Sequence, residues 1–295
     1  MDDNRTSVSV LGLGLMGQAL AATFLKAGRA TTVWNRSADK ADRLVADGAV
    51  LAGTPADAVA ASDLVVVCLS TYDVVHEVIG PLGDALHGKT VVNLTSGSSE
   101  QARDTAEWAR KNGAAYLDGA IMATPPGIGA ETSVLFYAGD EAVFDAHEPV
   151  LRLLGGGTTY LGTDHGKPAL FDVSLLGLMW GALNSFLHGV AIVETGGVKA
   201  REFVPWAHMW LDAIKIFTAD YAAQIDAGDG EFPANDARLE THLGALRHLL
   251  EESEALGVDT ALPEYSRKLM EGVIAQGHAR NSYASVITAY RRPAR

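Results

Sequence analysis

Cysteine is almost missing from this sequence, because Cys68 is the only one among 295 residues. One cysteine excludes an internal disulfide and every metal site that needs several thiolates, so we expect no metal. The same scarcity fits a reducing compartment. The polar start, Met1–Thr6, lacks the charged region and cleavage site of a signal peptide. We therefore expect a cytoplasmic protein.

Positive charge is also scarce, with 23 Lys and Arg against 36 Asp and Glu, a formal net charge of -13. The two basic clusters, Arg36 to Lys40 and Arg291 to Arg295, are too short to reverse this balance. Such a chain would repel a nucleic-acid backbone. We expect no nucleic-acid partner.

An uninterrupted membrane-spanning run is missing too. The apolar segment from Ala169 to Val193 is broken by Asp172, Asn184 and His188, and such groups need partners inside lipid. We expect a buried helix of a soluble protein here and no membrane contact. With 295 residues, 48% of them hydrophobic, the chain is long enough for two domains.

A glycine-rich turn stands near the start of the chain. The apolar run Ser7 to Leu11 predicts a strand and Gln18 to Ala27 predicts a helix, with the sequence GLGLMG between them. In such a turn the first glycine permits the tight bend, the second lets a pyrophosphate approach backbone N–H groups, and the third lets helix pack on strand. The pattern predicts dinucleotide contacts by Gly12, Leu13, Gly14, Leu15, Met16 and Gly17.

Further strands and helices follow at regular spacing. We expect strands at Thr31 to Trp34, Asp63 to Leu69 and Thr90 to Leu94, and a helix from Ser37 to Asp47. This alternation is typical of a doubly wound, mostly parallel sheet, the Rossmann fold, whose ligand lies at the carboxyl ends of the strands. Residues that follow the third and fourth strands are then further cofactor contacts: Cys68, Leu69, Ser70, Asn93 and Thr95. Cys68 itself is interpreted as a small core residue at a strand end, not a nucleophile.

The end of the second strand indicates which dinucleotide binds. An acid there would bind the ribose 2′-hydroxyl of NAD and repel the 2′-phosphate of NADP. The sequence instead has Asn35, Arg36 and Ser37, with Lys40 one turn later. A guanidinium, a hydroxyl and an ammonium suit one phosphate, so we expect NADPH, although a solvated basic turn would have the same sequence.

The second half of the chain predicts helices. After two more expected strands, Tyr116 to Met122 and Thr132 to Ala138, we place the domain boundary so that residues 1–162 form the NADP-binding domain and 163–295 an all-α domain. A long helix is expected from Gly166-Lys167-Pro168 to about Glu194. A helix so long and apolar on nearly all faces needs a second protein to cover it, which predicts an intertwined homodimer.

Asp172 lies on the apolar face of this helix. Desolvation would raise the pKa of its carboxyl group, whereas the nearby helix N-terminus would lower it, so the sequence leaves the direction open. A structural acid with a backbone or basic partner is the alternative.

The order GLGLMG, NRS, a TSG turn and then a long helix resembles the β-hydroxyacid dehydrogenases and, more closely, the imine reductases, along essentially the whole chain. Where the hydroxyacid enzymes have a catalytic lysine followed by an asparagine, this sequence has Asp172 and Leu176. Their serine-glycine-glycine carboxylate grip is replaced by the segment from Met122 to Pro126. Lys167, as a displaced catalytic lysine, falls one turn early.

The resemblance to imine reductases implies NADPH-dependent hydride transfer to C=N bonds, chiefly of cyclic imines, with reductive amination of ketones as a further activity. Asp172 would be the catalytic residue, either as proton donor or as anionic partner of an iminium, and would favour R-products. Asn93 and Trp180 would be the first residues to examine for reductive amination. The implied substrate pocket is formed by Ser96, Met122, Leu176, Met179, Trp180 and Trp210.

Two further segments carry weaker expectations. Trp206 lies with Trp210 on the next amphipathic helix, where the family often walls its pocket. The run from His242 to His248 is expected to precede a helix that reaches across the dimer, with both histidines in core or solvent.

Two other functions remain open from the sequence. One is a β-hydroxyacid or semialdehyde dehydrogenase with unusual acid–base groups, which would need a carboxylate-binding site. The other is an NADP-binding protein without catalysis, acting as a redox sensor or scaffold.

Overall fold

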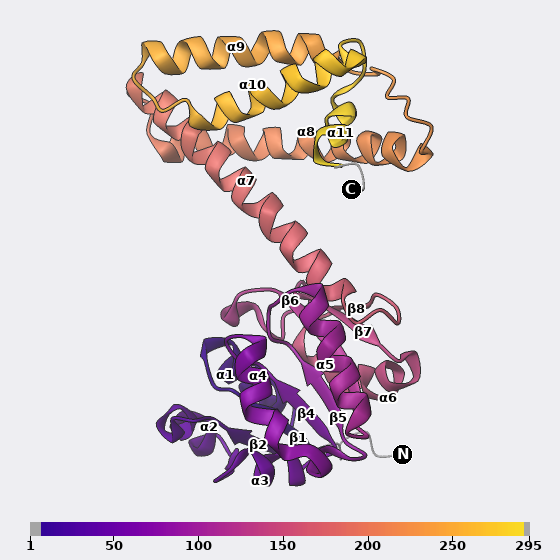
Figure 1. Cartoon of the computed structure of the whole chain (residues 1–295). Coiled ribbons are helices and arrows are strands. Elements are labelled where there is room, and N and C mark those ends of the chain that lie inside the picture. The colour runs from indigo at the N-terminus through magenta and orange to yellow at the C-terminus, as the bar shows by residue number, and fades with distance from the viewer. Residues whose placement is uncertain (1–6, 292–295) are drawn as a thin grey trace. The chain divides into compact units, whose positions relative to one another are not determined.

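The computed structural model describes residues 7–291 and divides into two compact units, Met1–Gly177 and Leu178–Arg295 (Figure 1). The long helix α7, Lys167–Thr195, begins in the first unit and continues into the second. Met1–Thr6, where we expect no signal peptide, and residues 292–295 lie outside the described part.

The first unit is built on one eight-stranded sheet with the order β3-β2-β1-β4-β5-β6-β7-β8. All neighbouring strands pair in parallel except β6 and β7. The doubly wound, mostly parallel sheet predicted from the sequence is thereby confirmed. The strands are β1 (Val8–Leu11), β2 (Thr31–Trp34), β3 (Val50–Leu51), β4 (Leu64–Val67), β5 (Thr90–Asn93), β6 (Ala115–Met122), β7 (Val134–Gly139) and β8 (Gly157–Tyr160).

Alternating side chains of the strands fill two cores, one on each face of the sheet. In β4, Leu64 and Val66 belong to one core and Val65 and Val67 to the other, as period-two alternation requires. Both faces are apolar because helices cover both. These helices are α1 (Leu15–Lys26), α2 (Asp42–Ala46), α3 (Pro55–Ala60), α4 (Tyr72–Ile79), α5 (Ser99–Lys111) and α6 (Glu141–Leu151).

Helices joined by loops, with no strand among the described residues, make up the second unit. After α7 come α8 (Ala200–Ala227), α9 (Leu239–Ala255), α10 (Ala261–Val273) and α11 (Ile287–Tyr290). Gly228 ends α8 with a φ of +69°, the left-handed conformation that glycine adopts without strain. A small core between α9 and α10 contains Leu239, Leu243, Met270 and Val273.

Several expected elements differ from the structure. The helix expected from Ser37 to Asp47 is a 3-10 turn, Ala38–Ala41, followed by the short α2. Several elements were not predicted, among them the strands β3 and β8, which are too short for a clear alternation, and the helices α3, α4, α5 and α6. The run from His242 to His248 lies inside α9 and does not precede it.

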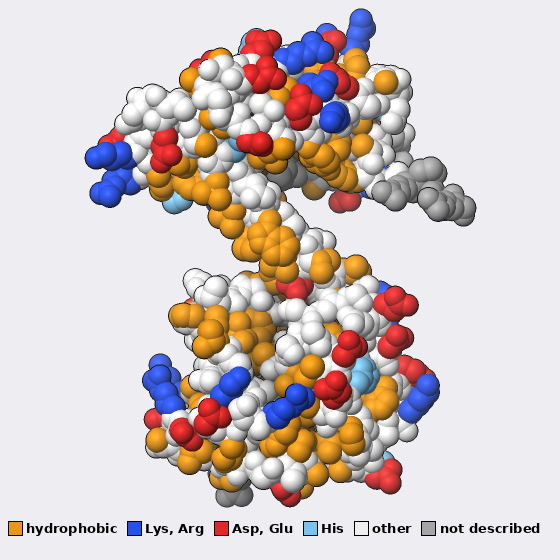
Figure 2. Space-filling view, turned by 60° about the vertical axis from the view of Figure 1, so that its left-hand side comes forward, with side chains coloured by type: hydrophobic (Ala, Val, Ile, Leu, Met, Phe, Trp, Pro, Cys, Tyr) orange, Lys and Arg blue, Asp and Glu red, His pale blue; other side chains and the backbone are white. Residues whose placement is uncertain are grey.

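The expectation that α7 is a buried helix is wrong for the single chain. Only Pro168, Ala169 and Asp172 of this helix are buried, and Figure 2 shows orange, apolar side chains on its surface. By length and composition alone α7 is long and apolar enough to cross a membrane, and 6% of its apolar 18-residue segment is buried. One such helix is weak evidence for a span.

Candidate functional site

The glycine-rich turn joins β1 to α1 and leaves no room for side chains at two of its three glycines. Gly12 has a φ of +100°, and a Cβ atom there would collide with the carbonyl oxygen of Cys68. A Cβ atom on Gly17 would collide with the carbonyl oxygen of Gly12, whereas one on Gly14 meets nothing within 4 Å. Gly14 therefore keeps open the space in front of the helix N-terminus, where an anion is favoured.

A cleft of about 460 Å³ opens along this turn, at the carboxyl ends of β1, β2 and β4. The structure brings most of the predicted cofactor contacts together there. The lining residues are Gly12, Gly14, Leu15, Met16, Gly17, Trp34, Asn35, Arg36, Ser37, Lys40, Cys68, Leu69, Ser70, Val74 and Val78.

Three predicted contacts do not line the cleft. The side chain of Leu13 is fully buried in the core, and its N–H donates to Asn35 Oδ1 at 2.9 Å. Asn93 and Thr95 are also buried, and the Thr95 hydroxyl accepts the N–H of Leu69 at 3.0 Å. These side chains support the walls of the cleft instead of facing it.

Asn35 links two walls of the cleft. Its Oδ1 accepts from Leu13, and its Nδ2 donates to the carbonyl oxygen of Ser37 at 3.0 Å. Both ends of the amide are thus used by backbone groups. Asn35 fixes the glycine turn against the turn that carries Arg36.

The corner after β2 carries the basic groups that were predicted to bind a phosphate. Arg36, Ser37 and Lys40 all line the cleft. Arg36 Nη2 lies 3.4 Å from Glu77 Oε2 of α4, and both side chains are largely exposed. Glu77 was not predicted, because only the tertiary fold brings it to Arg36.

The sequence reasoning also missed the three apolar lining residues Trp34, Val74 and Val78. Val74 and Val78 are four residues apart on α4, which places them on one helical face. The Thr71 hydroxyl, which accepts the N–H of Val74 at 3.3 Å, is an N-cap signal that identifies this helix from sequence.

Asp172 lies in the second turn of α7 and is 6% exposed. Burial raises the pKa of its carboxyl group, and a hydrogen bond with Ser96 opposes that shift. Ser96 lies in the turn after β5. The direction of the pKa shift, which the sequence left open, is therefore upward.

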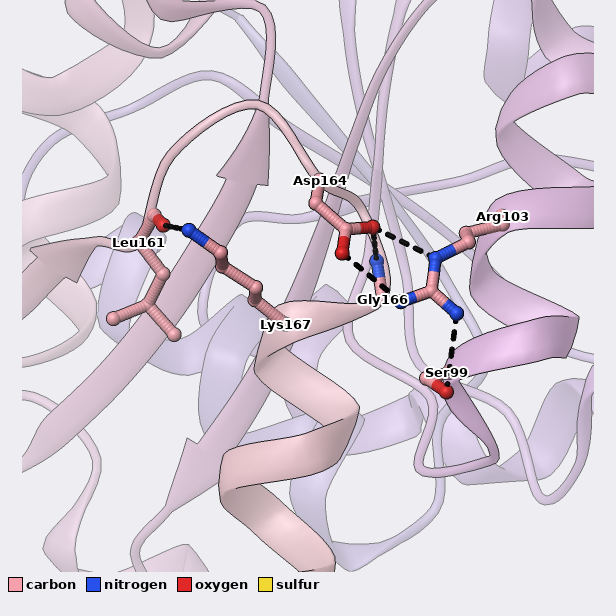
Figure 3. Close-up of polar contacts among 6 residues, drawn as sticks. All are labelled: Ser99, Arg103, Leu161, Asp164, Gly166 and Lys167. Carbon is pink, nitrogen blue, oxygen red and sulfur yellow. Dashed lines mark hydrogen bonds and ion pairs between the residues drawn. The ribbon is translucent and has the colours of Figure 1, made fainter. Parts of the chain in front are cut away.

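The chain entering α7 is fixed to α5 by an ion pair (Figure 3). Arg103 donates through Nε and Nη2 to the two carboxylate oxygens of Asp164 at 2.8 and 2.9 Å, and Gly166 N–H donates to the same carboxylate at 3.0 Å. The Arg103 guanidinium lowers the pKa of Asp164 to about 2, helped by the Gly166 N–H. This ion pair fixes the start of α7, the helix that carries Asp172.

Lys167 shows no catalytic placement. Its Nζ donates to the carbonyl oxygen of Leu161 at 3.0 Å, back toward the loop before the helix (Figure 3). The exposed ammonium thus closes the loop, which speaks against a displaced catalytic lysine.

The predicted substrate-pocket residues fall in both units. Ser96, Met122 and Leu176 belong to the first unit, and Met179, Trp180 and Trp210 to the second. The last three are exposed in the single chain, as is Trp206. The pocket as a whole stays a prediction.

Cys68 lines the cleft at the end of β4 and is half-buried. Burial raises the pKa of its thiol to about 11, so the thiolate that a nucleophile needs is scarce at neutral pH. Within residues 7–291 no group of three or more His, Cys, Asp or Glu side chains is placed to hold a metal ion.

Two family models match adjoining parts of the chain. Residues 7–162 match the NAD binding domain of 6-phosphogluconate dehydrogenase, and residues 164–292 match the NADPH-dependent reductive aminase-like C-terminal domain.

Relatives resemble the chain over nearly its whole length. An NADPH-dependent reductive aminase of Aspergillus oryzae is 36% identical over 96% of this chain and 97% of its own length. An imine reductase from Myxococcus stipitatus in complex with NADP+ has a TM-score of 0.90 at 35% identity, covering 97% of this chain and 100% of that one. A reductive aminase from Aspergillus terreus in complex with NADPH4, cyclohexanone and allyl amine has a TM-score of 0.90 at 39% identity, with the same coverage.

Proposed function

The chain belongs to the imine reductase and reductive aminase family, and from this premise we propose how its residues divide the work of reducing a C=N bond. The protein is an NADPH-dependent oxidoreductase that reduces imines and iminium ions to amines and carries out reductive amination. The observation that carries the residue assignment is the buried Asp172, with its raised pKa, where the hydroxyacid dehydrogenases have lysine.

The cleft of the first unit fits the cofactor by its donor set. The open space at Gly14 suits a pyrophosphate at the N-terminus of α1, and Arg36, Ser37 and Lys40 suit the 2′-phosphate. Asn35, where an acid would select NAD, is an amide whose two ends already bond to backbone. When bound, NADPH supplies the hydride that the C=N carbon accepts.

Asp172 acts on the nitrogen atom of the C=N bond. For a neutral imine it donates a proton to nitrogen, and for a preformed iminium it serves as the anionic partner. Burial raises the pKa of its carboxyl group above the ordinary value, which is the direction that a proton donor needs. The Ser96 side chain lowers the pKa of this carboxyl group, against the effect of burial.

We propose that residues from two copies of the chain form the substrate pocket. In the second unit the exposed apolar side chains lie mainly on α7 and α8, among them Leu178, Leu187, Trp206, Trp210 and Ile216. Surfaces of this kind mark protein interfaces. We place the domain boundary at residues 162 and 163 and expect a homodimer in which Met179, Trp180 and Trp210 face an apolar amine precursor.

Two finer assignments belong with this proposal. Asp172 is expected to favour R-products, which chiral analysis of the amine tests. The single half-buried Cys68 fits a reducing, cytoplasmic setting.

The activity is tested by product stoichiometry. The purified protein is incubated with NADPH and 2-methyl-1-pyrroline, and 2-methylpyrrolidine and NADP+ are quantified. Equal amounts of amine and NADP+ from the wild-type protein, with none from Asp172→Ala at equal NADPH binding, support the proposal. Amine formation by Asp172→Ala at the wild-type rate would remove Asp172 from the mechanism.

A further inference from the structure

A buried carboxylate that has no part in the proposed mechanism lies beneath the turn after β5. Asp118 of β6 is 1% exposed, and its Oδ2 accepts hydrogen bonds from the hydroxyls of Tyr72 at 2.6 Å and Tyr116 at 2.7 Å. Tyr116 lies two residues before Asp118 on the strand, so both side chains point to one face of the sheet. Charges are rarely buried in this way without a cation, so the site needs a reason.

The directions of these hydrogen bonds fix the orientation of the Asn93 side-chain amide. An ionised carboxylate only accepts, so the Tyr116 hydroxyl must donate to Asp118 and is left as an acceptor. Asn93 Nδ2 donates to that hydroxyl at 3.0 Å. The Asn93 Oδ1 atom is then turned to the N–H of Thr95, from which it accepts at 3.1 Å.

This chain of hydrogen bonds leads from Asp118 to the cofactor cleft and toward Asp172. The Thr95 hydroxyl accepts the N–H of Leu69, which lines the cleft. Ser96, the neighbour of Thr95, lowers the pKa of Asp172 through its side chain. The turn from Asn93 to Ser96 thus connects Asp118 with both functional parts of the first unit.

We propose that Asp118 is a positioning residue for the reaction: through Tyr116 it orients the amide of Asn93, and Asn93 in turn fixes the turn that holds Ser96 against Asp172. This inference rests on the proposed function. A turn displaced by about 1 Å costs a reaction of this type up to about 100-fold, because hydride transfer depends on geometry.

Tyr72 provides the matched control. It donates to the same oxygen as Tyr116, whereas the 3.0 Å hydrogen bond from Asn93 Nδ2 goes to the Tyr116 hydroxyl. Its ring lies against Gly97, where a Cβ atom would collide with it. Tyr72→Phe keeps this packing and removes one hydrogen bond to Asp118, whereas Tyr116→Phe also removes the acceptor of the 3.0 Å hydrogen bond from Asn93 Nδ2.

The groups around Asp118 favour a change in its protonation state that the side-chain amide of Asn93 would report. Burial raises the pKa of Asp118 to about 7, against the two tyrosine hydrogen bonds, which lower it. His165 packs on Tyr116, and burial lowers its pKa. His76 of α4 bonds to Thr105 instead, and Ala138, the β7 partner of Asp118, is uncharged.

The first test compares kcat for 2-methyl-1-pyrroline, the Kd of NADPH and the melting temperature among Tyr116→Phe, Asp118→Asn and Tyr72→Phe. We expect Tyr116→Phe and Asp118→Asn to lower kcat about 10-fold with the Kd of NADPH changed less than about 3-fold, and Tyr72→Phe to stay within about 2-fold. Equal losses of kcat in the two Phe variants would overturn the proposal, because they would show a general packing role.

The second test needs no turnover. In protein labelled with 15N-asparagine, the side-chain amide signals of Asn93, assigned by their loss in Asn93→Ser, are followed against pH. We expect a transition near pH 7 that is absent from Tyr116→Phe and Asp118→Asn. In Tyr72→Phe its midpoint should rise, because a bond that lowers the pKa is lost.

The two tests separate the relay from the activity. Signals of Asn93 that titrate identically in Tyr116→Phe and wild type would contradict the relay even if imines are reduced. A wild-type protein that reduces no imine would refute the proposed function, while the amide titration would still decide whether Asp118 orients Asn93.

Discussion

The two units of the molecule bury their apolar side chains to different extents. In the first, both faces of the sheet are covered and strands such as β1 and β4 are fully buried. In the second, the core between α9 and α10 is small, and tryptophans on α7 and α8 are exposed. The first unit therefore forms its cofactor cleft and buried acid within one chain, whereas the second has a surface that a partner would complete.

The largest effect should come from the acid that the first unit buries. Asp172→Ala is expected to lower kcat about 100-fold or more, because positioned proton donors contribute about 10²–10⁴-fold, while the Kd of NADPH stays within about 3-fold. Steady-state kinetics and fluorescence titration measure the two quantities. A matched loss of NADPH binding would show that the cleft and the acid are not separate.

The 2′-phosphate corner tests the same unit at its exposed edge. Arg36→Ala is expected to weaken NADPH binding about 10- to 100-fold, the equivalent of one charge-assisted contact of about 1.5–3 kcal/mol, and to leave NADH binding nearly unchanged. Titration calorimetry with both cofactors measures this. Equal weakening of both would mean that Arg36 does not select the phosphate.

The apolar surface of the second unit is compared with a similarly exposed residue of the first. Leu187 of α7 is 60% exposed and Val50 of β3 is 63% exposed. Leu187→Glu is expected to weaken self-association about 10-fold, because a charge is desolvated at an interface, and Val50→Glu should not change it. Sedimentation velocity over a range of concentrations decides. A wild-type monomer at every concentration would contradict the shared substrate pocket.

The smallest effect is expected at the exposed pair of Arg36 with Glu77. Exposed ion pairs contribute about 0.2–1 kcal/mol and are screened by salt. Glu77→Gln frees Arg36 and should tighten NADPH binding about 2-fold at low salt, with less gain at high salt. Asp73→Asn, on the same helix, is the control. Equal tightening by both variants would reduce the effect to net charge.

Local patterns predicted the parts of the fold that depend on local physics. The strand, glycine turn and helix from Val8 to Lys26 follow from β-branched residues and from two glycines, Gly12 and Gly17, that tolerate no Cβ atom. α3 was missed although Thr54 and Asp57 form a capping box, a readable signal. β3 has two exposed residues and no readable alternation.

The site was predictable where neighbours in sequence are neighbours in space. Arg36, Ser37 and Lys40 lie on one turn, and they line one cleft. Glu77 is 41 residues from Arg36 and Asp118 is 46 from Tyr72, so their contacts depend on the packing of separate elements. The burial of Asp172, and hence the direction of its pKa shift, likewise depends on what α7 packs against.

The most direct test of the account is the initial rate of NADPH oxidation with 2-methyl-1-pyrroline, set beside NADH oxidation with the same imine and NADP+ reduction with 3-hydroxyisobutyrate. We expect rapid imine-dependent oxidation of NADPH, much slower oxidation of NADH and no reaction with the hydroxyacid. Turnover of the hydroxyacid alone would contradict it.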